Sequence, residues 1–271
     1  MTRVYVEGIG LCGPGLDGWS AAAPILSGQA AYDFTPANLT PSALLPPNER
    51  RRAPKMVKLA LAVGAEACTA AGRDPATTPT IFASSGGDGE TIHDILHTLA
   101  SPLRELSPTK FHNSVHNAAA GYWSIATGAM AASTSLCAHD DSFAAGLLEA
   151  VAQAAAAHQA VALIAYDVPY PEPLFAARPV GAMFGVALLL APTPSPAAFA
   201  RLDLTLEPHA GAPTQAAPAL ETLRQTTPAA RSLPLLAALA SGLAATVALD
   251  YLGDMSLRLA ILPRLAEGFS P

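Results

Sequence analysis

The stretch "ASTSLCAHDDSFAAGLLEAVAQAAAAHQAVALIAYD" (132–167) places one long alanine-rich segment between two short apolar ones. Residues 132–138 and 159–167 have the composition of buried strands, and residues 142–158 have the length and composition of a helix. A strand, a helix and a second strand in this order form a crossover unit, whose two strands run parallel. The stretch therefore predicts an α/β fold with mainly parallel strand pairing.

The chain on both sides continues this alternation. Gly72 and Gly128 follow apolar helical patterns as stop signals, and Asn117 precedes one as a start signal. Further strands are expected within residues 3–15, 80–90, 182–192 and 200–208, and further helices within 51–72, 91–103 and 117–130.

After Pro192 the composition changes to Pro, Ala and Thr. We therefore expect a domain over residues 1–191 and a shortened segment over 192–271, which packs on the same core and ends in two or three helices. The apolar run 235–249 falls short of the roughly 20 residues that span a bilayer, so it predicts a buried helix and no membrane span.

The composition limits the possible functions. Apolar residues make up 51% of the chain and charged residues 13%, and the net charge is −6 without a basic stripe, which argues against nucleic-acid binding. The three cysteines lie far apart and lack metal-binding or disulfide-framework spacing. Together with an N-terminus that lacks a signal-peptide pattern, they indicate a cytoplasmic protein.

The nonapeptide "TSLCAHDDS" (134–142) combines side chains that occur in catalytic and metal sites. Cys137 and His139 share one face of a strand, whereas catalytic pairs normally come from separate segments. Consecutive ligands on one segment also give poor tetrahedral geometry, so no metal and no cofactor is expected. Asp140, Asp141 and Ser142 together are typical of a capped helix start.

A rival interpretation keeps the nucleophile. In it the chain is a stand-alone acyl-transferring or thioester-hydrolysing enzyme that uses Cys137 or Ser142 with His139 or His116 as base.

Several segments, taken in order, resemble the β-ketoacyl synthases of the thiolase fold. They are "RVYVEGIGLCGPGLDGW" (3–19), "RRRAPKMVKLALAVGAEACTAAG" (50–72), "IFASSGGDGE" (81–90) and "SPTKFHNSVHNAAAGYWSIATG" (107–128). The resemblance covers roughly residues 3–191. It implies an α/β, thiolase-like fold in which the N-terminal half is complete and the C-terminal half is truncated.

The departures from that family concern its catalytic residues. Active members place a nucleophilic Cys at the helix N-terminus, where the helix lowers its pKa. Counting without gaps puts Asp140 at this position, or His139 after a one-residue slip, and Cys137 falls three residues early. The family's later histidine pair and lysine also lack counterparts, since only His209 follows His158. The resemblance therefore implies no catalytic residue and a protein that is not an enzyme.

A condensing-enzyme relative without a nucleophile resembles a chain-length factor of type II aryl polyene or polyketide systems, or of related fatty-acid-type biosynthesis. The resemblance implies a heterodimer with an active ketosynthase and docking of an acyl carrier protein. It assigns to the interface and acyl tunnel Lys110, Phe111, Asn117, Tyr122, Trp123, Ser135, Cys137 and Phe143. The candidate contacts for the acidic carrier protein are Arg50, Arg51, Arg52, Lys55 and Lys58.

Overall fold

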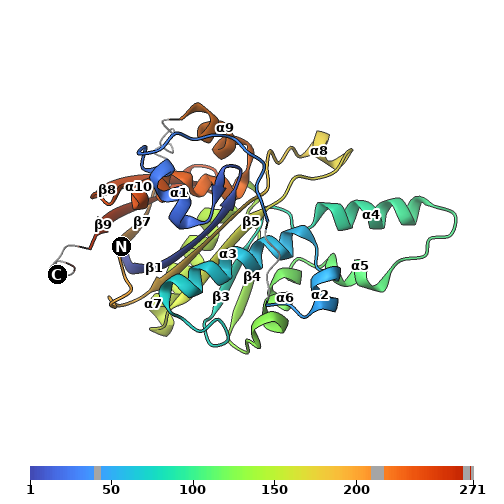
Figure 1. Cartoon of the computed structure of the whole chain (residues 1–271), viewed down its shortest axis with the longest axis horizontal. Helices are drawn as coiled ribbons and strands as arrows, with labels where there is room; N and C mark the ends of the chain where they lie inside the picture. Colours follow the sequence, from blue (N-terminus) through green and yellow to red (C-terminus); the bar gives the residue numbers. More distant parts are fainter. Residues whose placement is uncertain (40–43, 209–216, 265–268, 270–271) are drawn as a thin grey trace.

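In the part of the chain that the structure describes, one mixed sheet of nine strands forms the centre of the protein (Figure 1). The computed structural model describes residues 1–39, 44–208, 217–264 and 269. Along the sheet the strand order is β4-β3-β5-β6-β1-β7-β9-β8, and β2 pairs with β1. The strands are β1 (Thr2–Gly13), β2 (Leu16–Asp17), β3 (Thr80–Ala83), β4 (Ser133–Leu136), β5 (Val161–Asp167), β6 (Phe184–Ala191), β7 (Ala200–Pro208), β8 (Ala245–Tyr251) and β9 (Met255–Pro263).

The α/β class is confirmed, but the expectation of mainly parallel pairing is wrong. Among the described strands, only β3 pairs in parallel, with β4 on one side and β5 on the other. All the other pairs are antiparallel. The physical reason lies in the connections: β5 and β6 are sequential neighbours joined by a segment with only the short helix α8 (Leu174–Ala177), which returns the chain beside β5 instead of crossing the sheet.

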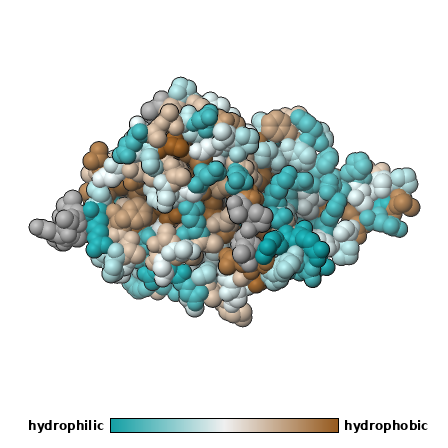
Figure 2. Space-filling view, viewed as in Figure 1, coloured by the Kyte–Doolittle hydropathy of each residue, from teal (hydrophilic) through white to brown (hydrophobic). Residues whose placement is uncertain are grey.

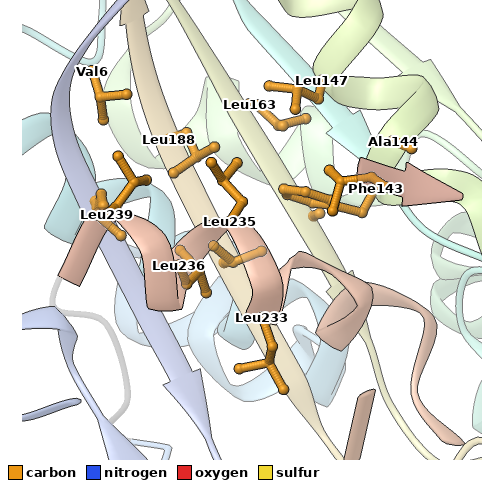
Figure 3. Packing of buried hydrophobic residues seen from close by; sticks show 14 of the residues in the cluster. Val6, Phe143, Ala144, Leu147, Leu163, Leu188, Leu233, Leu235, Leu236 and Leu239 are labelled. Carbon is orange, nitrogen blue, oxygen red and sulfur yellow. The ribbon is translucent and has the colours of Figure 1, made fainter. Parts of the chain in front are cut away.

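Helices cover both faces of the sheet and bury two apolar clusters. On one face, α3 and α6 pack around Met56, Phe82 and Trp123. On the other face, Phe143 and Leu147 of α7 meet the leucines of α10 over the sheet (Figure 3). No helix in the described part of the chain is long and apolar enough to cross a membrane. The longer helices are α1 (Trp19–Leu26), α3 (Lys55–Ala71), α4 (Gly89–Ala100), α6 (Ala118–Thr127), α7 (Ser142–Ala157), α9 (Pro218–Thr226) and α10 (Leu233–Ser241).

The predicted helix signals hold at three positions. Gly72 (φ 64°) and Gly128 (φ 71°) end α3 and α6 in the left-handed conformation, and Asn117 is the N-cap residue of α6. The predicted helix over 51–72 is divided in two, because Ala53 precedes a proline and is extended, which separates α2 (Pro47–Arg52) from α3.

The end of the chain differs from the sequence expectation. The run 235–249 is not one helix, since Gly242 (φ 64°) ends α10 and the following residues form β8. The described C-terminal part closes with the β8–β9 hairpin instead of helices. Every second residue of β9 is apolar and buried, which places Leu257, Leu259 and Ile261 on one face of the sheet. This burial stabilises the hairpin over a helix in the last part of the described chain. His209 lies outside the described residues.

Residues 89–116 form an arm that projects from the body (Figure 1). It consists of α4, a connection and the short helix α5 (Pro108–Asn113). Leu96 and Leu99, on the apolar face of the predicted helix, are exposed. Figure 2 shows hydrophobic residues at the far end of the arm.

Candidate functional site

The corner between β4 and α7 is held by ion pairs. His139 adopts φ 53°, and His139–Asp141 form a single 3-10 turn (η1) between the strand and the helix. One oxygen of Asp140 lies 2.6 Å from Nη2 of Arg178, and the other lies 3.1 Å from Nη2 of Arg231. Two arginines from distant segments therefore converge on the residue that the sequence places at the nucleophile position.

Asp141 joins the same network. Its carboxylate lies 3.0 Å from Nη1 of Arg231 and accepts a hydrogen bond of 3.0 Å from the backbone N–H of Leu252. The three residues 140–142 lie at the start of α7, as expected, and Asp141 is the N-cap residue. The expected side-chain cap is absent at this end of α7, because both carboxylates bind arginine instead.

These contacts keep Asp140 ionised. Burial by itself raises the pKa of this carboxyl, but the hydrogen bond from Arg178 and the charges of Arg231, Arg178 and His139 outweigh burial and lower the pKa below its ordinary value. A carboxylate held by two arginines is a weak nucleophile, since its charge is already neutralised.

The candidate nucleophiles of the rival interpretation are engaged in backbone contacts. The hydroxyl of Ser142 is buried, accepts a hydrogen bond from the N–H of Ala138 (3.0 Å) and donates one to the carbonyl of His139 (2.7 Å). The thiol of Cys137 donates to the carbonyl of Ser85 (3.1 Å). No hydrogen bond joins either side chain to a histidine ring of the described residues, so neither has a base in place.

On its inner side, around Asp140, the corner encloses only a small cavity. The cavity beside Asp140 has a volume of about 10 Å³, close to the space that one water molecule needs. Asp141, Phe143, Arg231 and Leu249 line it. This inner cavity is too small for an acyl thioester, so Asp140 cannot be reached by one from this side. Within the described part of the chain, no three His, Cys, Asp or Glu side chains gather as a metal site.

Asp167, a residue that the sequence reasoning missed, lies behind this corner. Its fully buried side chain accepts hydrogen bonds from the N–H and hydroxyl of Ser85 (2.9 and 2.7 Å) and from the N–H of Ala229 (2.9 Å). It thereby ties the end of β5 to the turn after β3 and to the 3-10 turn η2 (Pro228–Ser232). The available signal was an acid as the last residue of an apolar strand. A carboxyl group in such a position is normally buried only when it has hydrogen-bond or ion-pair partners.

The buried carboxyl of Asp167 predicts a pH dependence of stability. Burial raises its pKa to about 6, and the bonds from Ser85 and Ala229 limit the increase. This pKa is higher in the folded protein than the value of 3.8 in the unfolded chain, so the folded state favours the protonated carboxyl. The contribution of Asp167 to the free energy of unfolding is therefore fully present below pH 3.8 and is lost as the pH rises through 6. Urea unfolding at pH 5 and pH 7 is expected to show a larger difference between the wild type and Asp167→Ala at pH 5. An equal difference at both values would contradict this protonation.

The three lysines of the chain surround one cleft of about 410 Å³ between α3, α4 and α5. Lys110 lies 2.8 Å from Asp94, and Lys55 lies 3.5 Å from Glu90. Arg52 and Lys58 line the same cleft. The structure thus brings Lys110, predicted for the tunnel, next to part of the basic run predicted for a carrier protein. Arg51 is exposed, whereas Arg50 donates to the carbonyl of Leu45.

The other predicted interface residues are divided between the core and the surface. Tyr122, Trp123 and Phe143 are 1–2% exposed, so their side chains lie inside the chain. Phe111 is 64% exposed. The remaining three lie at the surface or partly so, on α6 and around β4: Asn117, Ser135 and Cys137.

The family of the chain follows from a sequence comparison. The family model of the β-ketoacyl synthase N-terminal domain matches residues 22–248, so the chain belongs to the β-ketoacyl synthase family. A search of curated proteins finds no match.

Solved structures agree with this fold. A ketosynthase (ApeO) in complex with its chain length factor (ApeC) from Xenorhabdus doucetiae contains a chain with a TM-score of 0.72 and 23% identity, with 96% of this chain and 99% of that one covered. The ishigamide ketosynthase/chain length factor gives a TM-score of 0.71 at 14% identity, with 97% and 99% covered. A type II acyl-carrier protein complex with its ketosynthase, AntDE:AntF, gives 0.72 at 12% identity, with the same coverages.

Proposed function

We propose that this chain is a non-catalytic, chain-length-factor-like subunit, which pairs with an active β-ketoacyl synthase and helps to shape the tunnel for the growing acyl chain. The distribution of exposed apolar side chains carries the proposal. Eight of the fourteen large hydrophobic side chains exposed among the described residues lie between residues 96 and 130, where a second protein can cover them. They are Leu96, Leu99, Leu103, Leu106, Phe111, Val115, Ile125 and Met130.

Strand β4 lies at the edge of the sheet and is a second observation in favour of an interface on this side of the protein. The carbonyls of Ala132 and Leu136 accept hydrogen bonds from β3, from the N–H groups of Thr80 and Ser84. Since backbone groups alternate along a strand, those of Ser133 and Ser135 point to the free edge of the sheet. An uncovered edge pairs readily with another strand. We propose that the ketosynthase partner pairs here, beside α6.

The absence of catalysis is proposed from the corner. The negative charge of Asp140 is balanced by two arginines, and the cavity next to its side chain has a volume of only about 10 Å³. The side chains of Cys137 and Ser142 form hydrogen bonds with backbone groups. The stand-alone enzyme with Cys137 or Ser142 as nucleophile is therefore the weaker alternative.

The partners are proposed from the chemistry of the surface and from the names of the compared complexes. Two of those are ketosynthases with chain length factors, and the third contains a carrier protein. By analogy, an acidic acyl carrier protein docks near the basic run 50–58, in a cytoplasmic polyketide or aryl polyene system. Residues 1–191 are the ketosynthase-like domain in this proposal, and 192–271 are the shortened C-terminal segment.

Co-expression with a ketosynthase tests the proposal. We expect a stable 1:1 complex by size-exclusion chromatography with light scattering, and Cys137→Ala is expected to keep the condensation rate of this complex within about two-fold, because the thiol does not enter the reaction. The ketosynthase alone serves as the reference. Loss of turnover in a folded, assembled Cys137→Ala complex would overturn the silent role, and thioester turnover by the isolated chain would favour the alternative.

A further inference from the structure

Helix α5 contacts the body of the protein through one buried side chain and through the ring of His112, whose centroid lies 6.1 Å from that of Tyr122. Asn113 is the only buried residue of this helix, with 5% of its surface exposed. Asn113 follows Phe111 by two residues, which is about 200° around a helix. Burying Asn113 therefore turns Phe111 away from the body, in agreement with its 64% exposure.

The Asn113 amide is paired on both sides. Its Nδ2 donates to the carbonyl of Arg52 at the end of α2 (3.1 Å), and its Oδ1 accepts from the hydroxyl of Tyr122 on α6 (3.0 Å). A carbonyl only accepts, so Arg52 fixes which way the amide faces. Burial raises the pKa of Tyr122, which keeps its phenol protonated and able to donate at neutral pH.

The second polar link of α5 is weaker. Lys110 binds Asp94 of α4 at 2.8 Å, but both side chains are nearly half exposed, and such surface pairs contribute at most about 1 kcal/mol. It also joins α5 to the arm itself. The buried amide, bonded to two elements of the body, is therefore the stronger polar attachment of α5.

We infer that Asn113 and Tyr122 are positioning residues, which fix α5 against α2 and α6 and so set where Phe111 is presented to the partner. The consequence for the acyl tunnel depends on the proposed function. The attachment of α5 is a property of this chain alone, so the two can be tested separately.

Hydrogen–deuterium exchange on the isolated chain tests the attachment. Tyr122→Phe removes one hydroxyl without changing the ring, and Asn113→Ala removes both hydrogen bonds. We expect exchange of residues 107–116 to rise at least about ten-fold in Asn113→Ala and less in Tyr122→Phe, with β5 unchanged. The matched control is His97→Ala, an exposed arm residue. Unchanged exchange in Asn113→Ala would overturn the inference.

The assembled complex tests the positioning. Asn113→Ala and Tyr122→Phe are expected to shift the chain-length distribution of the product in the same direction as Phe111→Ala, at retained 1:1 assembly. Faster exchange with an unchanged product distribution would make the two residues merely structural and overturn the inference. If the wild type fails to assemble with a ketosynthase, the proposed function fails, while the exchange rates still decide whether Asn113 and Tyr122 hold α5.

Discussion

Ser135→Pro is expected to fold like the wild type and to bind a ketosynthase about 100-fold more weakly, which corresponds to about 2.7 kcal/mol. Proline removes the N–H group of Ser135, and that group points to the free edge of β4. Proline is tolerated on an edge strand when the lost donor faces solvent, so the bonds to β3 survive. Isothermal titration or surface plasmon resonance measures the affinity, and denaturant unfolding checks the fold.

Two matched variants separate pairing from folding. Ser135→Ala keeps the outward N–H and is expected to bind within a few-fold of the wild type. Thr134→Pro removes a donor that points to β3 and is expected to destabilise the isolated chain. If Ser135→Pro binds as tightly as Ser135→Ala, the partner does not pair with β4.

Asp167→Ala is expected to lower the free energy of unfolding by about 3–5 kcal/mol at neutral pH. The change removes the acceptor of four buried donors, namely the hydroxyl of Ser84, the N–H and hydroxyl of Ser85, and the N–H of Ala229. Each unsatisfied buried group costs about 1–3 kcal/mol, and part of this is recovered where water enters. Urea unfolding with far-UV circular dichroism measures the difference.

The control for this effect is Asp254→Ala, which removes an exposed carboxylate in the turn between β8 and β9. We expect it to change stability by less than about 0.5 kcal/mol. A loss below about 1 kcal/mol in Asp167→Ala would mean that Ser85 and Ala229 find other partners, and that Asp167 does not fix η2 behind the corner.

The sequence alone determined the elements whose signals are local. Gly72 and Gly128 end helices because glycine adopts positive φ at little cost, and an N-cap such as Asn117 precedes its helix directly. The order of apolar and glycine-rich segments over residues 3–191 also indicated the β-ketoacyl synthase family. The resemblance to that family also placed Asp140 at the nucleophile position, and in the structure Asp140 lies in η1, directly before α7.

The tertiary structure alone decided which distant residues meet. Arg178 and Arg231 lie 38 and 91 positions from Asp140, and Ala229 lies 62 positions from Asp167, so no local pattern links them. The direction of β6 and the change from α10 to β8 likewise depend on which neighbour each segment finds in the sheet. Hydrophobic periodicity along the sequence indicates whether a segment forms a helix or a strand. The topology of the sheet determines which charged side chains come together in the interior, where they are stable only as pairs. For this reason "TSLCAHDDS" has the composition of a reactive site, while its arginine partners make it an ion-paired corner.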